Sequence, residues 1–248
     1  MPRKRKRKPL CHKNGSLIGI DESNNGFSYC SCNPFHNSRS YVTIAGYFMT
    51  HDQHLEYNSK NKESKKGVFR DFIDVDEGLI RAKDFLEENP DFYYLSISKA
   101  EAQKTDMHTL RARAAATIAL KFLSDYDVDP EKTTIVMDDL NKYQRNHLKR
   151  RMHKLPQFTI PTDKDSFSYR VNKKLDQIFC ESGITTRHLS RENADKEISA
   201  VIKADLVAFY LSALNFCGNE KEWYYDHRRL DLKDLDSLVK EVASCKLI

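Results

Sequence analysis

Acidic residues directly follow two apolar segments of this sequence. Asp21 and Glu22 come after the apolar run at 17–20, and Asp138 and Asp139 come after the run at 135–137. In open α/β sheets, ligands bind at the carboxyl ends of strands, so acids at these positions would face a crevice. The alternative is that they are turn residues or helix N-caps, and Asp139 could cap a helix that begins at residue 140.

A further carboxylate, Asp205, lies within a helical apolar pattern. Small and apolar residues fall on one face of the segment 195–215, at Ile198, Val201, Ile202, Ala208, Phe209 and Ser212. Asp205 follows Ile202 by three positions and therefore falls in the same stripe. Because burying an unpaired carboxylate costs free energy, Asp205 needs a compensating partner. That partner is either Lys203 or an arginine from elsewhere, or a divalent cation shared with the other acids.

Clustered carboxylates without a matching set of His and Cys favour hard cations, Mg²⁺ or Mn²⁺, over zinc. Two such ions about 4 Å apart would activate water and stabilise the leaving oxygen of a phosphodiester. Cys30 and Cys32, with Cys11, His12 and His36 nearby, could instead bind zinc. Because Cys-Ser-Cys lacks the usual two-residue spacing, plain thiols are the preferred interpretation.

The positive charge of the chain is concentrated at its beginning. The 248 residues include 41 Lys or Arg and 36 Asp or Glu, which gives a net charge of +5. Six of the positive side chains lie in the first eight residues, so the rest carries 5 − 6 = −1. They are Arg3, Lys4, Arg5, Lys6, Arg7 and Lys8. We expect a flexible basic arm over 1–14 and a single domain over 15–248 with a C-terminal helical extension. The arm and the Lys/Arg-rich segment 142–154 would suit a polyanion such as nucleic acid.

The composition is that of a folded protein without a membrane helix. Hydrophobic residues make up 40% of the chain, with 8 Gly and 7 Pro, which argues against disorder. No apolar run is long enough to span a membrane, and none follows the basic arm as it would in a secretory signal. We therefore expect a cytoplasmic protein, or a nuclear one if the source cell has a nucleus, because the arm resembles an import signal.

The elements that must position these acids alternate between strand and helix patterns. Strands are predicted at 16–20, 41–49, 92–97, 133–137 and 184–189, and a loop at 51–67. Helices are predicted at 79–88, 105–126, 140–154, 166–181, 195–215 and 230–245. This alternation predicts an α/β fold. Because 41–49 follows the first strand too closely for a helical crossover, we expect these two to be antiparallel neighbours in a mixed central sheet flanked by helices.

Residues 19–26 read Gly-Ile-Asp-Glu-Ser-Asn-Asn-Gly and resemble the opening of type 2 ribonucleases H, Gly-Val-Asp-Glu-Ala-Gly-Arg-Gly. The resemblance continues through 41–49, through the helical segment before the strand that ends in Asp138, and through Ala194-Asp195 and the small-residue helix after it. It implies an RNase-H-like fold and cleavage of the RNA strand of RNA–DNA hybrids. It also implies two Mg²⁺ or Mn²⁺ ions held by Asp21, Glu22, Asp138 and Asp195.

Two departures from that family bear on the site. Asn24, Asn25 and Gly26 stand where the family has the loop that contacts the ribonucleotide 2′-hydroxyl, so they are candidate nucleic-acid contacts. Asp205 stands where the family has Ser. Uncharacterised RNase-H-like proteins that open with Asp-Glu-Ser-Gly and carry Ala-Asp-Leu in a late helix resemble residues 21–23 and 204–206.

Asp195 and Asp205 are alternatives for the same role. Ten helical residues, about 15 Å, separate them, so a continuous helix lets only one of them join a given metal pair. The apolar pattern favours Asp205, and the type 2 alignment favours Asp195.

The sequence thus predicts a metal-dependent nuclease acting on RNA, an RNA–DNA hybrid or DNA. A catalytically inactive nucleic-acid-binding protein of the same fold is one alternative, and a phosphoesterase for small molecules is another. The aromatic segment 223–225 could stack on bases or pack on the core.

Overall fold

In the computed structural model, the described residues are 15–23, 41–60, 75–98, 105, 107–139, 167–192, 198–217 and 224–245. The predicted arm (1–14), the candidate loop residues Asn24, Asn25 and Gly26, the Cys and His residues considered for zinc, the basic segment 142–154 and Asp195 all lie outside them.

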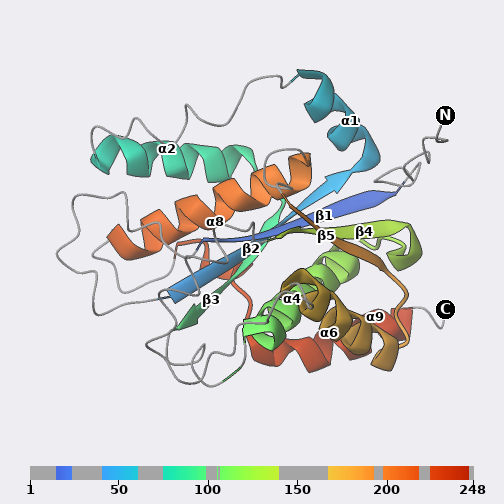
Figure 1. Cartoon of the computed structure of the whole chain (residues 1–248). Coiled ribbons are helices and arrows are strands. Elements are labelled where there is room, and N and C mark those ends of the chain that lie inside the picture. Colours follow the sequence, from blue (N-terminus) through green and yellow to red (C-terminus); the bar gives the residue numbers. More distant parts are fainter. Residues whose placement is uncertain are drawn as a thin grey trace, which may run out of the picture.

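The core of the fold is a five-stranded mixed sheet with β1 at its centre (Figure 1). Its strands are β1 (Ser16–Ser23), β2 (Tyr41–Thr50), β3 (Phe92–Ser98), β4 (Thr133–Asp139) and β5 (Arg187–Glu192), in the order β3-β2-β1-β4-β5. Strands β1, β2 and β3 pair antiparallel, whereas β4 runs parallel to both β1 and β5. The predicted α/β class and mixed sheet are confirmed.

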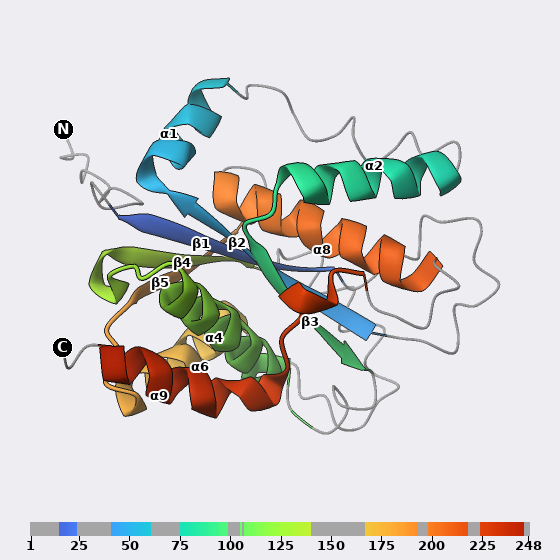
Figure 2. The ribbon, with the colours of Figure 1, turned by 180° about the vertical axis from the view of Figure 1, so that it is seen from behind.

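Helices cover both faces of the sheet (Figures 1 and 2). On one face lie α1 (His51–Lys60), α2 (Val75–Glu88) and α8 (Ser199–Cys217). On the other lie α4 (Met107–Asp125), α6 (Phe167–Glu181) and α9 (Leu235–Cys245). Successive side chains of β1 point to opposite faces of the sheet, so Leu17 packs with α8, whereas Ile18 and Ile20 pack with α4.

Two glycines let the helices approach the sheet closely. A Cβ placed on Gly19 would lie 2.1 Å from the carbonyl carbon of Ala200, at the start of α8. A Cβ placed on Gly46 in β2 would lie 2.3 Å from a methyl group of Ile118 in α4. Residue 19 must therefore be glycine for α8 to lie against β1, and this contact fixes where along β1 the helix begins.

Several element boundaries differ from those predicted. The predicted loop at 51–67 was wrong over its first ten residues, which form α1. Thr50 and Gln53 begin this helix by exchanging side chain-to-backbone hydrogen bonds, a capping box that the polar composition concealed.

Strand β1 continues through Ser23, and β4 includes Asp138 and Asp139, so these acids lie within strands and not in turns after them. Helix α2 begins four residues earlier than predicted, at Val75.

Strand β5 begins three residues later than predicted. Gly183 adopts a positive φ of 65° after α6, and the Ile184 N–H returns to the Phe179 carbonyl at 3.0 Å. This is the turn that commonly ends a helix. Ile184 is therefore buried in the helix-ending turn instead of starting the strand.

The segment 224–230 packs along the outer edge of β3. Arg229 forms a parallel bridge with Tyr94, and the Leu230 N–H donates to the Tyr94 carbonyl at 2.8 Å. Tyr225 stacks edge-on against Phe92 with ring centroids 5.7 Å apart. Tyr224 and Tyr225 thus pack on the core, while Trp223 lies outside the described residues. Within the described ranges, no helix is long and apolar enough to cross a membrane.

Candidate active site

Two of the predicted acids sit next to each other near the end of β1. Asp21 is buried, and one of its carboxylate oxygens accepts the Glu22 backbone N–H at 2.8 Å. On the neighbouring parallel strand, Ile20 is paired in register with Met137. The next residues along the two strands are Asp21 and Asp138, and adjacent strands lie about 4.8 Å apart. The backbone therefore brings positions 21 and 138 together, whereas the Asp138 side chain is outside the described part of the chain.

Glu22 forms a buried ion pair with helix α4. Its Oε2 lies 2.8 Å from Nη2 of Arg111, and the two side chains are only 12% and 4% exposed. Successive strand residues point to opposite faces, so Glu22 follows Ile18 and Ile20 toward α4, away from the α8 side. The ion pair also shows that the first turns of α4 lie at the carboxyl end of β1.

The charges around Glu22 oppose one another. Burial raises the pKa of Glu22, which is the largest influence, and the nearby Arg111 guanidinium lowers it. The carboxylate of Asp205 raises this pKa further, because a second negative charge close by disfavours ionisation. The net direction is upward. Asp205 therefore acts electrostatically on Glu22 from the opposite layer of the fold.

The contact between Gly19 and Ala200 explains how Asp205 reaches this end of the sheet. From Ala200 to Asp205 the helix rises about 7.5 Å, and from Gly19 to Glu22 the strand advances about 10 Å. Because Asp205 acts on Glu22, α8 and β1 must run toward the same end of the sheet from the contact between Ala200 and Gly19. Asp205 is therefore near Glu22, and its role as a metal ligand stays a prediction.

Asp205 is less buried than its helical pattern predicts. The fully buried positions of α8 include Val201, Ala204, Val207, Ala208 and Leu211, and Asp205 lies beside this face with its side chain half-buried. Lys203, the alternative ion-pair partner, instead hydrogen-bonds to Asn89 and lies 5.4 Å from the ring centroid of Tyr47. Lys203 is thus engaged with other residues.

Sequence reasoning missed Arg111. A signal was available, because Arg111 lies between Leu110 and Ala114 in a helix whose inner face is almost entirely apolar. A charged residue in that setting needs a buried partner of opposite charge, by the same argument that singled out Asp205.

The chemistry of this group is that of carboxylate oxygens, the donors that suit Mg²⁺ or Mn²⁺. Among the described residues, no three His, Cys, Asp or Glu side chains converge closely enough to hold a cation by themselves. The side chain of Asp138 is outside the described residues, so its part in holding a cation stays a prediction.

No family model matches this chain, and no curated protein matches its sequence. Two solved structures are similar in fold. One is a mutant of Bst-RNase HIII, with 14% identity and a TM-score of 0.42, which covers 84% of this chain and 58% of that one. The other is the ribonuclease H2 from Pyrococcus horikoshii OT3, with 11% identity and a TM-score of 0.44, which covers 93% of this chain and 98% of that one.

Both matched proteins are named as ribonucleases H. The chain spans a little over half the length of the matched RNase HIII. At these identities and TM-scores, the activity of this chain has to be argued from its own residues.

Proposed function

We propose that this protein is a metal-dependent nuclease that hydrolyses phosphodiester bonds in nucleic acid, with RNA or the RNA strand of an RNA–DNA hybrid as its substrate. The observation that carries the proposal is the gathering of acids from three elements at one end of the sheet. Asp21 and Glu22 lie near the end of β1, the backbone of Asp138 lies next in register on β4, and Asp205 on α8 is close enough to act on Glu22.

In this proposal Asp21, Glu22, Asp138 and Asp205 hold the cations, and Asp195 is the alternative to Asp205. Mg²⁺ or Mn²⁺ held by these acids would supply an activated water and a positive charge for the leaving oxygen of a phosphodiester. The Glu22 N–H holds one Asp21 oxygen in place, and Arg111 fixes the direction of the Glu22 carboxylate. Asn24, Asn25 and Gly26 follow β1 directly in the sequence and would contact the substrate strand next to the acids.

One observation favours a second candidate function, nucleic-acid binding without catalysis. Glu22 already has an ionic partner in Arg111, so one of the four acids is engaged before any cation arrives. A protein that had lost its chemistry could keep such a pair for stability alone. The two functions differ in their dependence on metal, because binding without catalysis persists in chelator with a salt dependence set by phosphate contacts.

The test is cleavage of three labelled substrates, namely an RNA–DNA hybrid, duplex RNA and single-stranded DNA, each in Mn²⁺, Mg²⁺ or EDTA. Asp21→Asn and Asp138→Asn should each abolish metal-dependent cleavage with an unchanged circular dichroism spectrum. Asp84→Asn, which alters an exposed carboxylate on α2, is the matched control and should cut like the wild type.

Comparing Asp205→Asn with Asp195→Asn identifies the fourth acid, because the substitution at the true ligand should abolish cleavage. Full activity in both Asp21→Asn and Asp138→Asn would refute the nuclease mechanism. No cutting of any substrate by the wild type, with binding that survives EDTA, would support the binding protein instead.

A further inference from the structure

Helices α4 and α6 begin at the same end of the sheet as the candidate acids. Each helix leads through a short connection into a parallel strand, α4 into β4 and α6 into β5. Each therefore runs back along the sheet and starts at the carboxyl ends of those strands. The Arg111–Glu22 pair fixes this placement for α4. The two helices pack side by side on one face of the sheet (Figure 2).

The starting halves of these two helices are exclusively basic. Residues 107–117 of α4 contain two arginines, Arg111 and Arg113, and no carboxylate. Residues 167–174 of α6 contain Arg170, Lys173 and Lys174, again with no carboxylate. The acids of α6 come later, and one of them, Asp176, pairs with His188 on β5 at 2.9 Å. Positive charge is thus concentrated at the end of each helix that borders the acidic site.

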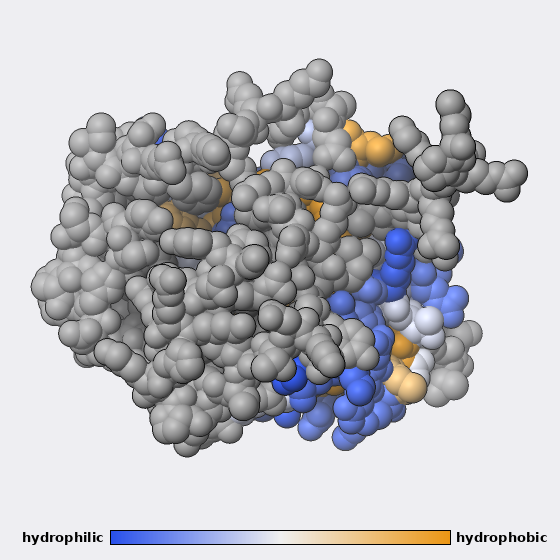
Figure 3. Space-filling view, in the orientation of Figure 1, coloured by the Kyte–Doolittle hydropathy of each residue, from blue (hydrophilic) through white to orange (hydrophobic). Residues whose placement is uncertain are grey.

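The basic side chains of α6 share one side of the helix. Arg170, Lys173 and Lys174 are spaced by three and four positions, which places them together on a helical surface. Val171, Leu175 and Phe179 form the buried side that packs on the core. Lys173 is exposed, and the described surface over α6 is mainly hydrophilic (Figure 3).

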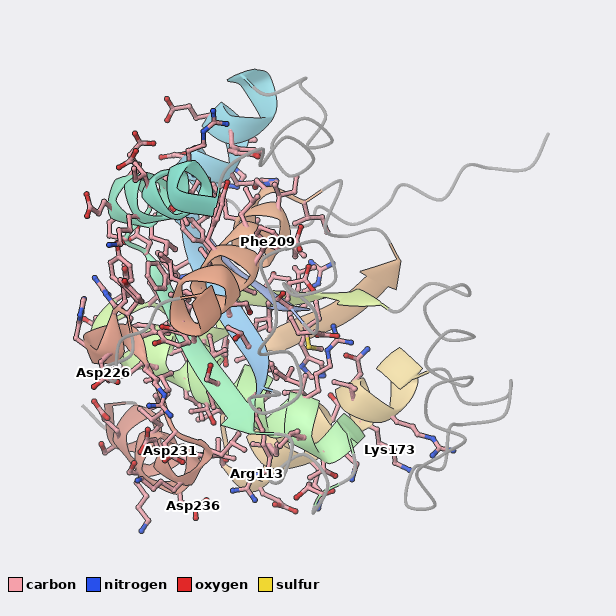
Figure 4. All side chains as sticks on the ribbon, turned by 90° about the vertical axis from the view of Figure 1, so that its left-hand side faces the viewer. Arg113, Lys173, Phe209, Asp226, Asp231 and Asp236 are labelled. Carbon is pink, nitrogen blue, oxygen red and sulfur yellow. The ribbon has the colours of Figure 1, made fainter. Side chains whose placement is uncertain are left out.

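Arg113 extends this basic surface onto α4. It is two residues beyond Arg111, about 3 Å along the axis, and on a different side of the helix. Its Nε is buried without a hydrogen-bond partner among the described residues, and its side chain is half-buried. In Figure 4, Arg113 lies between Lys173 on one side and Asp231 and Asp236 on the other. Arg113 thus lies beside the basic side chain Lys173 of α6, whereas Asp231 pairs with Lys233 at 3.2 Å on the α9 side.

We propose that Arg113, Arg170, Lys173 and Lys174 form a basic surface that binds the phosphate backbone of a nucleic acid strand beside the cleaved bond. This inference rests on the proposed function and assigns its substrate-binding face. A polyanion reaching the acids across the starting halves of α4 and α6 meets these four side chains and, among the described residues of those halves, no carboxylate. Cationic side chains next to a carboxylate site offset the repulsion between those acids and the phosphates.

The experiment measures equilibrium binding of a fluorescein-labelled RNA–DNA hybrid in EDTA, so that no cleavage occurs, over a range of salt concentrations. Each phosphate contact contributes about 0.9 to the slope of log affinity against log salt. Lys173→Gln should reduce that slope by about 0.9 and weaken binding about eightfold at 0.1 M salt. Arg113→Gln should do the same. Lys240→Gln, an exposed lysine on α9 with the same charge change, is the matched control and should bind like the wild type.

Thermal melting of each variant checks that the fold is retained, and the exposed Lys173 keeps the test valid if Arg113→Gln is unstable. Wild-type affinity and slope in both Lys173→Gln and Arg113→Gln would overturn the proposal. So would an equal loss in Lys240→Gln, because any removed charge would then have the same effect. Reduced binding in the two variants without metal-dependent cleavage by the wild type would retain the surface and reject the nuclease. Normal binding by the two variants, together with metal-dependent cleavage by the wild type, would reject the basic surface and retain the nuclease.

Discussion

Replacing Gly19 by alanine should separate helix α8 from strand β1. The added Cβ would lie 2.1 Å from the backbone carbon of Ala200, 2.3 Å from its oxygen and 2.3 Å from the nitrogen of Val201. To reach the 3.4 Å at which ordinary van der Waals contact begins, the Cβ and the helix must move apart by about 1.3 Å. Backbone atoms cannot rotate away as a side chain can, so the whole helix start must shift.

The expected cost lies at the upper end of the range for overpacked cores, about 3 kcal/mol, measured as the loss of unfolding free energy in urea. Because the same helix carries Asp205, a shift of about 1 Å should also reduce cleavage by the folded fraction about a hundredfold. Gly46→Ala is the comparison, because its Cβ would lie 2.3 Å from Cγ2 of the buried, β-branched Ile118 on α4 and would not meet α8. It should also destabilise the fold, but it should not cause the hundredfold loss of cleavage by the folded fraction. A Gly19→Ala variant with wild-type stability would refute the close contact and with it the placement of Asp205.

Two further predictions concern buried polar groups. Burial raises the pKa of Glu22 above its ordinary 4.5, so the folded state binds the carboxyl proton more tightly than the unfolded state. The contribution of Glu22 to the unfolding free energy therefore falls as the pH rises from about 4.5 through the raised pKa. Glu22→Gln should remove this contribution, so that the unfolding free energy relative to wild type increases with pH over that window; parallel curves would contradict it. Ser199→Ala removes the buried 2.6 Å hydrogen bond between Ser199 Oγ and His54 Nδ1, and should cost about 1–3 kcal/mol in urea unfolding. Ser237→Ala, on an exposed hydroxyl, should have little effect, and equal losses in the two variants would show that the His54 bond is unimportant.

The strands that carry the acids could be predicted because their apolar runs are short and end at polar residues. The antiparallel pairing of β1 with β2 followed from loop length alone, since the connection between them is too short for a helical crossover. What sequence could not supply was the layer to which each acid points. Glu22 lies on the α4 side because strand residues alternate, and its partner Arg111 comes from a segment almost ninety positions later. Local patterns carry no information about such a pairing.

The helix at 51–60 was missed for a different reason. Its composition is polar, and the capping box of Thr50 and Gln53 begins it without an apolar stripe. For Asp205 the helical periodicity was predicted correctly, but the predicted buried face was too wide, because Asp205 is half-buried at its border. The deepest contact of α8 is made by its small residues against Gly19, and a hydrophobicity pattern gives little weight to Ala200 and Ala204.

The pairing of Arg229 with Tyr94 has a consequence for biosynthesis. The outer edge of β3 presents unpaired backbone groups until residue 229 is available to cover part of it, and exposed strand edges are templates for association with other chains. The two positions are 229 − 94 = 135 residues apart. At the usual rate of translation, the nascent chain would carry that open edge for about 7 to 27 s. Ribosome-bound intermediates truncated before residue 229 should therefore associate more readily than those that include it.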